Sequence, residues 1–261
     1  MSKNFELIQQ AEYNLKAGAS VATAPPLAQP QTGFRGFQTQ AEVVRKDAGL
    51  NLDKITREES VRLVQRVFLQ AGTENPKAVV FAGINHGAGC SEICALAAEI
   101  LAESISGSVC LVEANLRTPS LPSIFGTTNH HGLTDALAKT DSIRNYVKKV
   151  RGNNLWLLSS GSALNGDGIV IGSDQNRARL NELRKEFDYL LIDAPPMGEY
   201  SDAIALGQTA DGLVMVLEAN STRREAAARV AENLRSAQVK ILGAVLNKRT
   251  FPIPASLYKV F

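Results

Sequence analysis

Six short apolar runs, separated by amphipathic segments, constrain the fold of this chain more than any other feature of its sequence. The runs are AVVFAG (78–83), VCLVEA (109–114), LWLLSS (155–160), YLLIDA (189–194), LVMVLEA (213–219) and ILGAVLN (241–247). The segments between them, such as SEICALAAEILAES, have the periodicity of helices. Strands that are apolar on both faces and alternate with helices form parallel sheets that helices cover on both sides. The sequence therefore predicts an α/β fold with three layers, built around a doubly wound, mostly parallel sheet.

The first fifty residues differ in composition from the rest of the chain. An apolar stripe of Phe5, Ile8 and Leu15 predicts a short helix that ends near Lys16. The stretch AGASVATAPPLAQPQTGF follows, and its lack of charge and of periodicity is typical of a flexible linker. The helix is either a solvated segment or a docking helix for a partner, and the residues alone do not distinguish the two.

We expect the main domain to begin near residue 54. Residues 1–53 would form the N-terminal helix and the linker, and residues 54–261 would form one α/β domain. A helix opens this domain, because Val61, Val64 and Phe68 share one side of a helical pattern.

Composition excludes several classes of protein. The chain has 28 basic and 26 acidic side chains, so its formal net charge of +2 gives no general attraction to nucleic acid or to acidic lipid. Three cysteines, an odd number in a chain of 261 residues, favour a reducing compartment over a disulfide framework. No apolar run approaches the roughly 20 residues of a membrane helix, and the charged N-terminus does not resemble a signal peptide. We therefore expect a soluble, cytoplasmic protein.

A glycine-rich turn follows the first apolar run and opens a helix near Cys90. Such a turn points backbone N–H groups inward, beside the positive end of the helix dipole, and suits phosphate groups. The usual phosphate loop ends in Gly-Lys-Ser/Thr, whereas this one reads Gly89-Cys90-Ser91. Losing one charge-assisted contact costs about 1.5–3 kcal/mol, which nucleotide binding can survive more readily than phosphoryl transfer. The glycines alone do not separate a phosphate site from a tight turn.

Two further segments favour the phosphate site. The run YLLIDAPP ends in Asp193, where a carboxylate can hold Mg²⁺ through water. The second apolar run leads to Glu113, Asn115 and Arg117. Both groups fall at the carboxyl ends of predicted parallel strands, which is the edge of the sheet where ligands bind.

With these motifs the chain resembles the cytoplasmic domain of bacterial tyrosine kinases (BY-kinases) of the capsular and exopolysaccharide type, relatives of the MinD/ParA group of P-loop proteins. Residues 86–91 (HGAGCS) stand where the family has roughly PGEGKS, and residues 113–126 (EANLRTPSLPSIFG) stand where it has DADLRRPSLHRLFG. The strand FDYLLIDAPP and the ending LNKRTFPIPASLY also fit. The resemblance implies Mg²⁺ held by Ser91 and Asp193. It implies that ATP or ADP is contacted by Gly87, Ala88, Gly89, Cys90, Ser91, Glu92 and Arg117.

The departures from the family pattern fall on the charged groups. Cys90 replaces the phosphate-loop lysine, and Glu113 and Asn115 replace two aspartates that assist Mg²⁺ and the reacting hydroxyl in the family. The MinD/ParA signature lysine would fall near Asn85 and is absent. The C-terminal tyrosine cluster of these kinases is reduced to Tyr258. The resemblance therefore implies a pseudokinase, in which nucleotide binding is weakened and the family-equivalent positions Cys90, Glu113 and Asn115 give no confident catalytic residue.

The resemblance also implies partners. Such a protein would act as a cytoplasmic accessory or regulatory protein of exopolysaccharide or capsule biosynthesis and export. It would reach the membrane through a membrane-embedded polysaccharide co-polymerase or export protein, and it would not bind nucleic acid. The family oligomerises through a helix with a Glu-x-x-Arg-x-x-Arg pattern, for which Glu59 and Arg62 fit, Gln65 takes the third place and Arg66 stands beside it.

Two other functions stay open. The chain is an active ATPase or tyrosine autokinase if another basic residue replaces the lysine, with Arg117 the nearest candidate by motif and Tyr258 one acceptor. It is a MinD/ParA-like positioning ATPase if it dimerises around nucleotide.

Four other features have simpler interpretations. Cys90, at a helix N-terminus, suggests redox chemistry, but a small residue that fills the space of the lysine is the favoured interpretation. Cys90 and Cys94 are one helical turn apart and lack an evident third metal ligand. The basic run 144–151 is interpreted as a solvated helix face, and Trp156 as a core residue.

Overall fold

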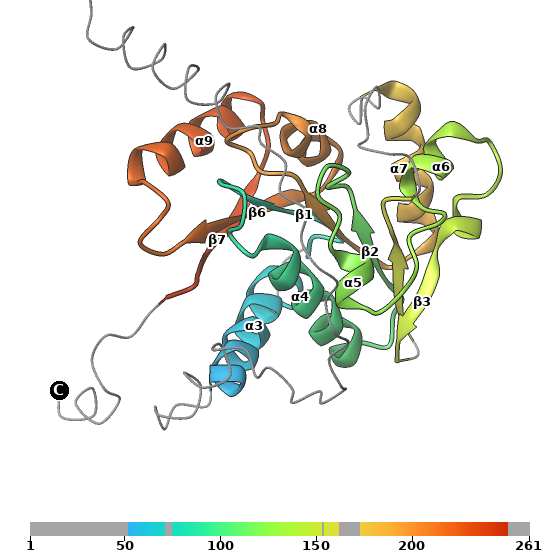
Figure 1. Cartoon of the computed structure of the whole chain (residues 1–261), viewed down its shortest axis with the longest axis horizontal. Coiled ribbons are helices and arrows are strands. Elements are labelled where there is room, and N and C mark those ends of the chain that lie inside the picture. The colour runs from blue at the N-terminus through green and yellow to red at the C-terminus, as the bar shows by residue number, and fades with distance from the viewer. Residues whose placement is uncertain (1–51, 71–74, 153, 162–172, 250–261) are drawn as a thin grey trace, which may run out of the picture. The chain divides into compact units, whose positions relative to one another are not determined.

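A computed structural model describes residues 52–70, 75–152, 154–161 and 173–249, and these residues form an α/β domain around a seven-stranded sheet. The strand order is β3-β4-β2-β5-β1-β6-β7 (Figure 1). Pairing is parallel except between β3 and β4. The strands are β1 (Ala78–Gly83), β2 (Val109–Glu113), β3 (Lys148–Arg151), β4 (Leu155–Leu158), β5 (Tyr189–Ala194), β6 (Gly212–Glu218) and β7 (Ile241–Asn247). The predicted fold class is confirmed, and each of the six apolar runs contains a strand.

Helices cover both faces of the sheet and give the three predicted layers. On one face α3 and α4 pack against alternate strand residues such as Val79 and Phe81, and on the other face α6 to α9 pack against residues such as Val80 and Val112. Figure 1 shows α3 and α4 on one side of the strands and α8 and α9 on the other. The helices are α3 (Leu52–Phe68), α4 (Cys90–Ser104), α5 (Leu121–Ile124), α6 (Leu133–Ala138), α7 (Asp174–Glu186), α8 (Asp202–Thr209) and α9 (Arg224–Ser236).

The basic run 144–151 is not a helix face, and that prediction is wrong. A short 3₁₀ turn, η2 (Ile143–Tyr146), leads into β3, which pairs antiparallel with β4 at the edge of the sheet. Arg144 lies 5.0 Å above the ring of Trp156 and 5.1 Å above that of Phe187, so its charge is used for stacking. Lysines on an edge strand also discourage pairing with another chain.

Trp156 is only half-buried, so its prediction as a core residue is correct in part. Its ring packs against Phe187 at 6.1 Å and lies under the two basic side chains Arg144 and Lys149. The ring therefore covers the edge of the hydrophobic core and does not lie at its centre.

Some predicted elements lie outside the described residues. These are the N-terminal helix and linker and the C-terminal segment that contains Tyr258. Among the residues that are described, no helix is long and apolar enough to cross a membrane.

The burial of α3 generates a test of the fold. Phe68, at the end of α3, is fully buried and lies edge-on against Tyr189 of β5 at 6.1 Å. We expect Phe68→Ala to lower the free energy of unfolding by about 3–5 kcal/mol in urea denaturation, because it leaves a cavity under the helix. The exposed Gln65→Ala on the same helix should change it by less than about 0.5 kcal/mol. Equal effects of the two variants would show that α3 does not belong to the core.

Candidate functional site

The loop between β1 and α4 has the backbone of a phosphate-binding turn. Gly87 and Gly89 both have φ of +78°, which favours glycine. A Cβ on Gly89 would lie 2.3 Å from the Asn247 side-chain nitrogen, whereas one on Gly87 would meet nothing within 4 Å. Gly89 caps the N-terminus of α4 without a side-chain hydrogen bond. The first N–H groups of α4 and its positive dipole end therefore face the turn.

Ser91 and Asp193 are brought together as predicted. The Ser91 hydroxyl, in the first turn of α4, donates a hydrogen bond of 2.6 Å to Asp193 Oδ2 on β5. Asp193 is fully buried, and its other oxygen, Oδ1, accepts no hydrogen bond from any residue that the structure describes. Two hard oxygen donors, one of them a buried carboxylate with an unused atom, fit the preference of Mg²⁺ for oxygen.

The electrostatics of Asp193 reflect the missing lysine. Burial raises the pKa of its carboxyl to about 7, and hydrogen bonding to Ser91 and interaction with the Cys90 thiol only partly offset this. The negative charges of Glu113 and Glu92 raise the pKa further. A lysine at position 90 would place an ammonium group near this carboxylate, whereas the cysteine that stands there leaves its charge uncompensated.

Cys90 is held as a neutral thiol. Burial, and then the charge of Asp193, raise its pKa well above the usual value. A thiolate is the reactive form, so this environment favours the space-filling interpretation of Cys90 over a redox role. In the described part of the chain no group of three or more His, Cys, Asp or Glu side chains could hold a metal ion.

Glu113 lies at the end of β2, beside Asp193 in the sheet register, but it binds the backbone. Its Oε1 accepts hydrogen bonds from the N–H groups of Ser120 (2.5 Å) and Leu121 (2.7 Å), and its Oε2 accepts one from Ser160 (3.2 Å). Burial raises the pKa of this carboxyl, and the three N–H donors act in the opposite direction. Glu113 therefore fastens the start of α5 and the chain after β4 to the centre of the sheet.

Asn115 and Arg117 are engaged within their own region. Asn115 donates from Nδ2 to the Thr118 hydroxyl at 3.0 Å, closing a local turn. The Arg117 guanidinium lies 4.1 Å above the ring of Tyr200 and 3.9 Å from the carboxylate of Asp202. Arg117 thus links the second motif to the start of α8 in this structure.

Sequence reasoning missed two residues that contact the phosphate loop from β7. Asn247 donates from Nδ2 to the carbonyl of Ala88 at 2.9 Å. Lys248 donates from Nζ to the carbonyl of Gly87 at 2.6 Å and to Glu218 at 3.1 Å. The available signal was their position at the carboxyl end of the last strand, the edge at which the loop also lies.

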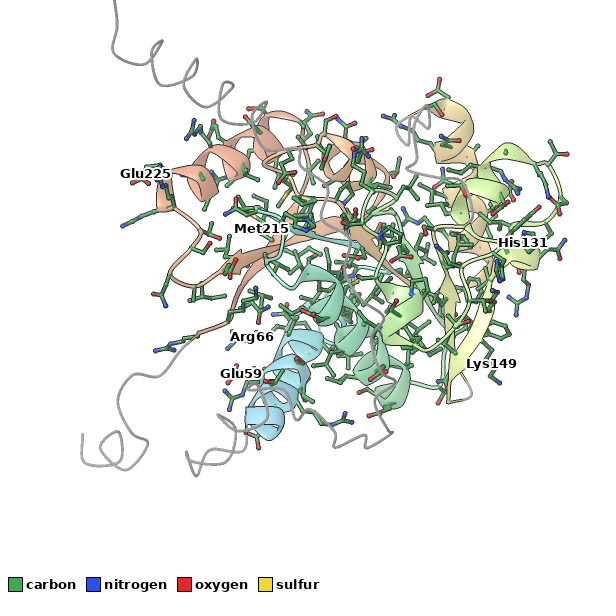
Figure 2. The ribbon with its side chains drawn as sticks, in the orientation of Figure 1. Glu59, Arg66, His131, Lys149, Met215 and Glu225 are labelled. Carbon is green, nitrogen blue, oxygen red and sulfur yellow. The ribbon has the colours of Figure 1, made fainter. Side chains whose placement is uncertain are left out.

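The predicted interface residues lie on the exposed side of α3. Glu59 and Arg62 form an ion pair of 2.6 Å with both side chains largely in solvent, and Arg66 is exposed. Figure 2 shows Glu59 and Arg66 on this helix. Their role in an interface stays a prediction.

A family model for ParA, described as NUBPL iron-transfer P-loop NTPase, matches residues 76–261. The tyrosine-protein kinase YwqD of Bacillus subtilis is 31% identical over 171 residues, which cover 66% of this chain and 72% of that protein. The tyrosine-protein kinase CpsD of Streptococcus agalactiae is 26% identical over 211 residues, covering 80% of this chain and 90% of the relative.

Solved structures share the fold. The kinase domain of the Escherichia coli tyrosine kinase ETK superposes with a TM-score of 0.62 at 23% identity, over 68% of this chain and 70% of that one. The kinase domain of VpsO superposes with a TM-score of 0.64 at 24% identity, over 77% of this chain and 100% of that one.

The two loop glycines generate a paired prediction. Gly87→Ala and Gly89→Ala both force an alanine to a φ of +78°, but only the second drives its methyl group into the Asn247 amide. We expect Gly89→Ala to lower the free energy of unfolding by roughly 1–3 kcal/mol more than Gly87→Ala does. Chemical denaturation of the two variants measures the difference, and equal losses would contradict the contact with Asn247.

The pKa of Asp193 generates a prediction for stability against pH. The folded state keeps the proton up to about pH 7, whereas the unfolded chain releases it near 3.8, so the folded state loses stability as the pH rises between these values. Asp193→Asn removes this loss. We expect the variant to exceed the wild type in unfolding free energy by about 3–4 kcal/mol at pH 8, and by only about 1–2 kcal/mol at pH 5. Urea denaturation in chelator at both pH values measures this.

Asp188 provides the matched control. Its carboxylate accepts hydrogen bonds from the backbone and hydroxyl of Ser108, which lower its pKa. Asp188→Asn should therefore lose stability relative to the wild type at pH 8 rather than gain it. An Asp193→Asn variant that follows the wild-type pH dependence would show that Asp193 carries its charge without strain.

Proposed function

The chain belongs to the ParA-like P-loop NTPase family, among the bacterial tyrosine kinases, and on this premise we propose that it is an accessory or regulatory protein that binds nucleotide without transferring phosphate. The observation that carries the proposal is the position of Cys90 beside the fully buried Asp193, where the family has a lysine, so that α4 supplies no side-chain positive charge there. Phosphoryl transfer needs positive charge where negative charge builds up in the transition state.

The loop backbone supports binding even so. Glycines in the left-handed region and the open N-terminus of α4 are present without the lysine. Ser91 and Asp193 would hold Mg²⁺, which when bound would help to neutralise the charge of the phosphate groups. Asp193 must release its proton to bind the metal, so binding of Mg²⁺ strengthens as the pH rises through about 7.

The pathway and the partner that we propose come from the similarity to bacterial tyrosine kinases. The protein would work in the cytoplasm in exopolysaccharide or capsule production, together with a membrane-embedded polysaccharide co-polymerase or export protein. Homo-oligomers would form through α3, where Glu59, Arg62 and Arg66 are exposed. The N-terminal domain boundary near residue 53 and a docking role for residues 1–16 belong to the same proposal.

Two alternative functions predict different experimental results. An active autokinase that uses Arg117 in place of the lysine would have to withdraw this side chain from Tyr200 and Asp202. A positioning ATPase of the ParA type would dimerise on binding nucleotide, which light scattering detects.

Restoring the lost charges tests the proposal. We expect the wild type to show neither ATP hydrolysis nor tyrosine phosphorylation above a blank without protein. The double variant Cys90→Lys, Asn115→Asp should bind Mg²⁺-ADP about 10- to 150-fold more tightly in calorimetry, because it regains one charge-assisted contact.

The control is Cys90→Met, Asn115→Asp, which adds side-chain length at position 90 without charge and should not gain affinity. Hydrolysis of ATP by the wild type that Asp193→Asn abolishes would refute the proposal and support an active enzyme. Dimerisation that depends on nucleotide would support the positioning ATPase.

A further inference from the structure

The phosphate loop has a positive charge in contact with it, and this charge comes from β7 rather than from α4. Lys248 directly follows β7, and its ammonium lies 2.6 Å from the carbonyl oxygen of Gly87. The preceding residue, Asn247, binds the next carbonyl, that of Ala88. Two consecutive residues thus bind two consecutive carbonyls of the loop. The bonded residues are 161 positions apart in the sequence for Lys248 and Gly87, and 159 apart for Asn247 and Ala88.

These contacts orient the loop. In a trans peptide the C=O and the following N–H point in opposite directions. Holding the carbonyls of Gly87 and Ala88 toward β7 therefore turns the N–H groups of Ala88 and Gly89 away from it. Neither N–H donates a hydrogen bond to another residue in the described ranges. Free, co-oriented N–H groups are the donors that a phosphate group uses.

The backbone at Lys248 is strained in a way that this role explains. Its φ is +55°, in the left-handed region that glycine or asparagine adopts more readily than lysine. Strained residues of this kind concentrate at functional sites. The second partner of Lys248 is Glu218, in an ion pair of 3.1 Å whose lysine is about half exposed. Exposed pairs contribute little to stability, so a ligand can displace Glu218 readily.

We propose that Lys248 is the counter-charge of the phosphate loop and takes over the electrostatic role that position 90 has lost. When the phosphate groups of a nucleoside di- or triphosphate bind the N–H side of the loop, the ammonium leaves Glu218 and the carbonyl of Gly87 and turns to a phosphate oxygen, while Asn247 still holds the carbonyl of Ala88. The proposal rests on the proposed function only in that the loop binds such a ligand. Arg117 does not serve this role, because its guanidinium stacks on Tyr200 and lies near Asp202.

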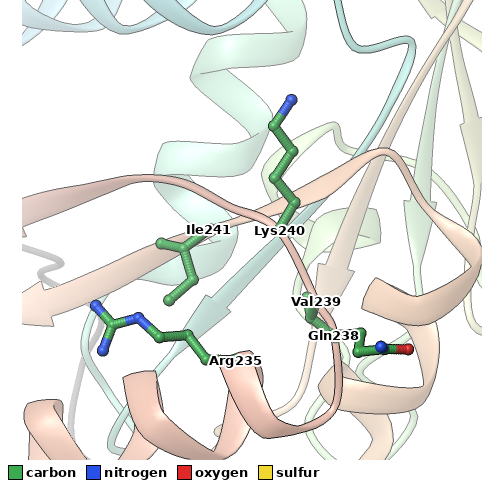
Figure 3. A pocket seen from close by; sticks show the side chains of 5 residues that line it. All are labelled: Arg235, Gln238, Val239, Lys240 and Ile241. Carbon is green, nitrogen blue, oxygen red and sulfur yellow. The ribbon is translucent and has the colours of Figure 1, made fainter.

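The test compares two lysines at opposite ends of one strand. Lys240 directly precedes β7, is exposed, and lines a separate hollow with Arg235 and Ile241 (Figure 3). Lys248→Met and Lys240→Met change the net charge equally, so a difference between them reports position and not overall charge. Calorimetric titration with Mg²⁺-ADP, and with pyrophosphate alone, measures the affinity of each variant.

We expect Lys248→Met to weaken binding of both ligands about 10- to 100-fold, since a charge-assisted contact is lost. Lys248→Arg should recover most of the affinity, and Lys240→Met should match the wild type. Lys248→Gly is a second test, because glycine suits the positive φ: it should keep the thermal midpoint of the wild type and lose the same affinity. An unchanged thermal midpoint would show that the loss of affinity does not come from a loss of the fold.

Wild-type affinity in Lys248→Met and Lys248→Gly would overturn the proposal. Absence of any binding of Mg²⁺-ADP or pyrophosphate to the wild type would overturn it too, while leaving an accessory role without catalysis intact. Turnover of ATP by the wild type would instead refute the proposed function, and the affinity ratio between Lys248→Met and Lys240→Met would still decide the role of Lys248.

Discussion

The hydrogen bond from Ser91 to Asp193 is the interaction on which the rest of the site depends. It joins the first turn of α4 to the centre of the sheet, and it is the one hydrogen bond between described residues that the buried Asp193 side chain accepts in good geometry. A buried carboxylate that is short of partners holds its proton, and the pKa of about 7 expresses this. The thiol of Cys90 beside it is also kept neutral by burial, which raises its pKa. The buried carboxylate at the centre of the site therefore lacks a full set of partners among the described residues.

The shape of the loop does not depend on the lysine that is absent. Two glycines supply the backbone conformation, and Asn247 with Lys248 hold the carbonyls from the neighbouring strand. A doubly wound sheet brings the ends of β1, β6 and β7 to one edge, so residues remote in sequence can support the same turn. This is why a chain can lose catalytic charges and still present a recognisable phosphate loop.

The sequence predicted much of this arrangement, and the misses have physical reasons. Continuous apolar runs are a strong signal, so six strands were found, whereas β3 is short, basic and paired at an edge, where a solvated face is tolerated. Ser91 and Asp193 lie together because the turn after β1 and the carboxyl end of the neighbouring strand β5 meet at one edge of the sheet. Lys248 was missed because its contact with Gly87 depends on strand order, and apolar runs do not specify the order. The sequence assigned Glu113 no confident catalytic role, and it did not predict the three backbone N–H groups that this side chain binds.

The hydrogen bonds of Glu113 have a consequence for the evolution of this chain. Position 90 lies at the start of α4 beside the buried Asp193, and one substitution there would introduce a lysine. Position 113 has become part of the framework: a return to aspartate would shorten the side chain by one methylene and draw the carboxylate away from N–H groups of Ser120, Leu121 and Ser160 that are buried around it. Restoring the family residue at position 113 would therefore disturb more of the surrounding hydrogen bonds than restoring it at position 90. The constraint on such a change lies in the hydrogen bonds at the end of β2 more than in the phosphate loop.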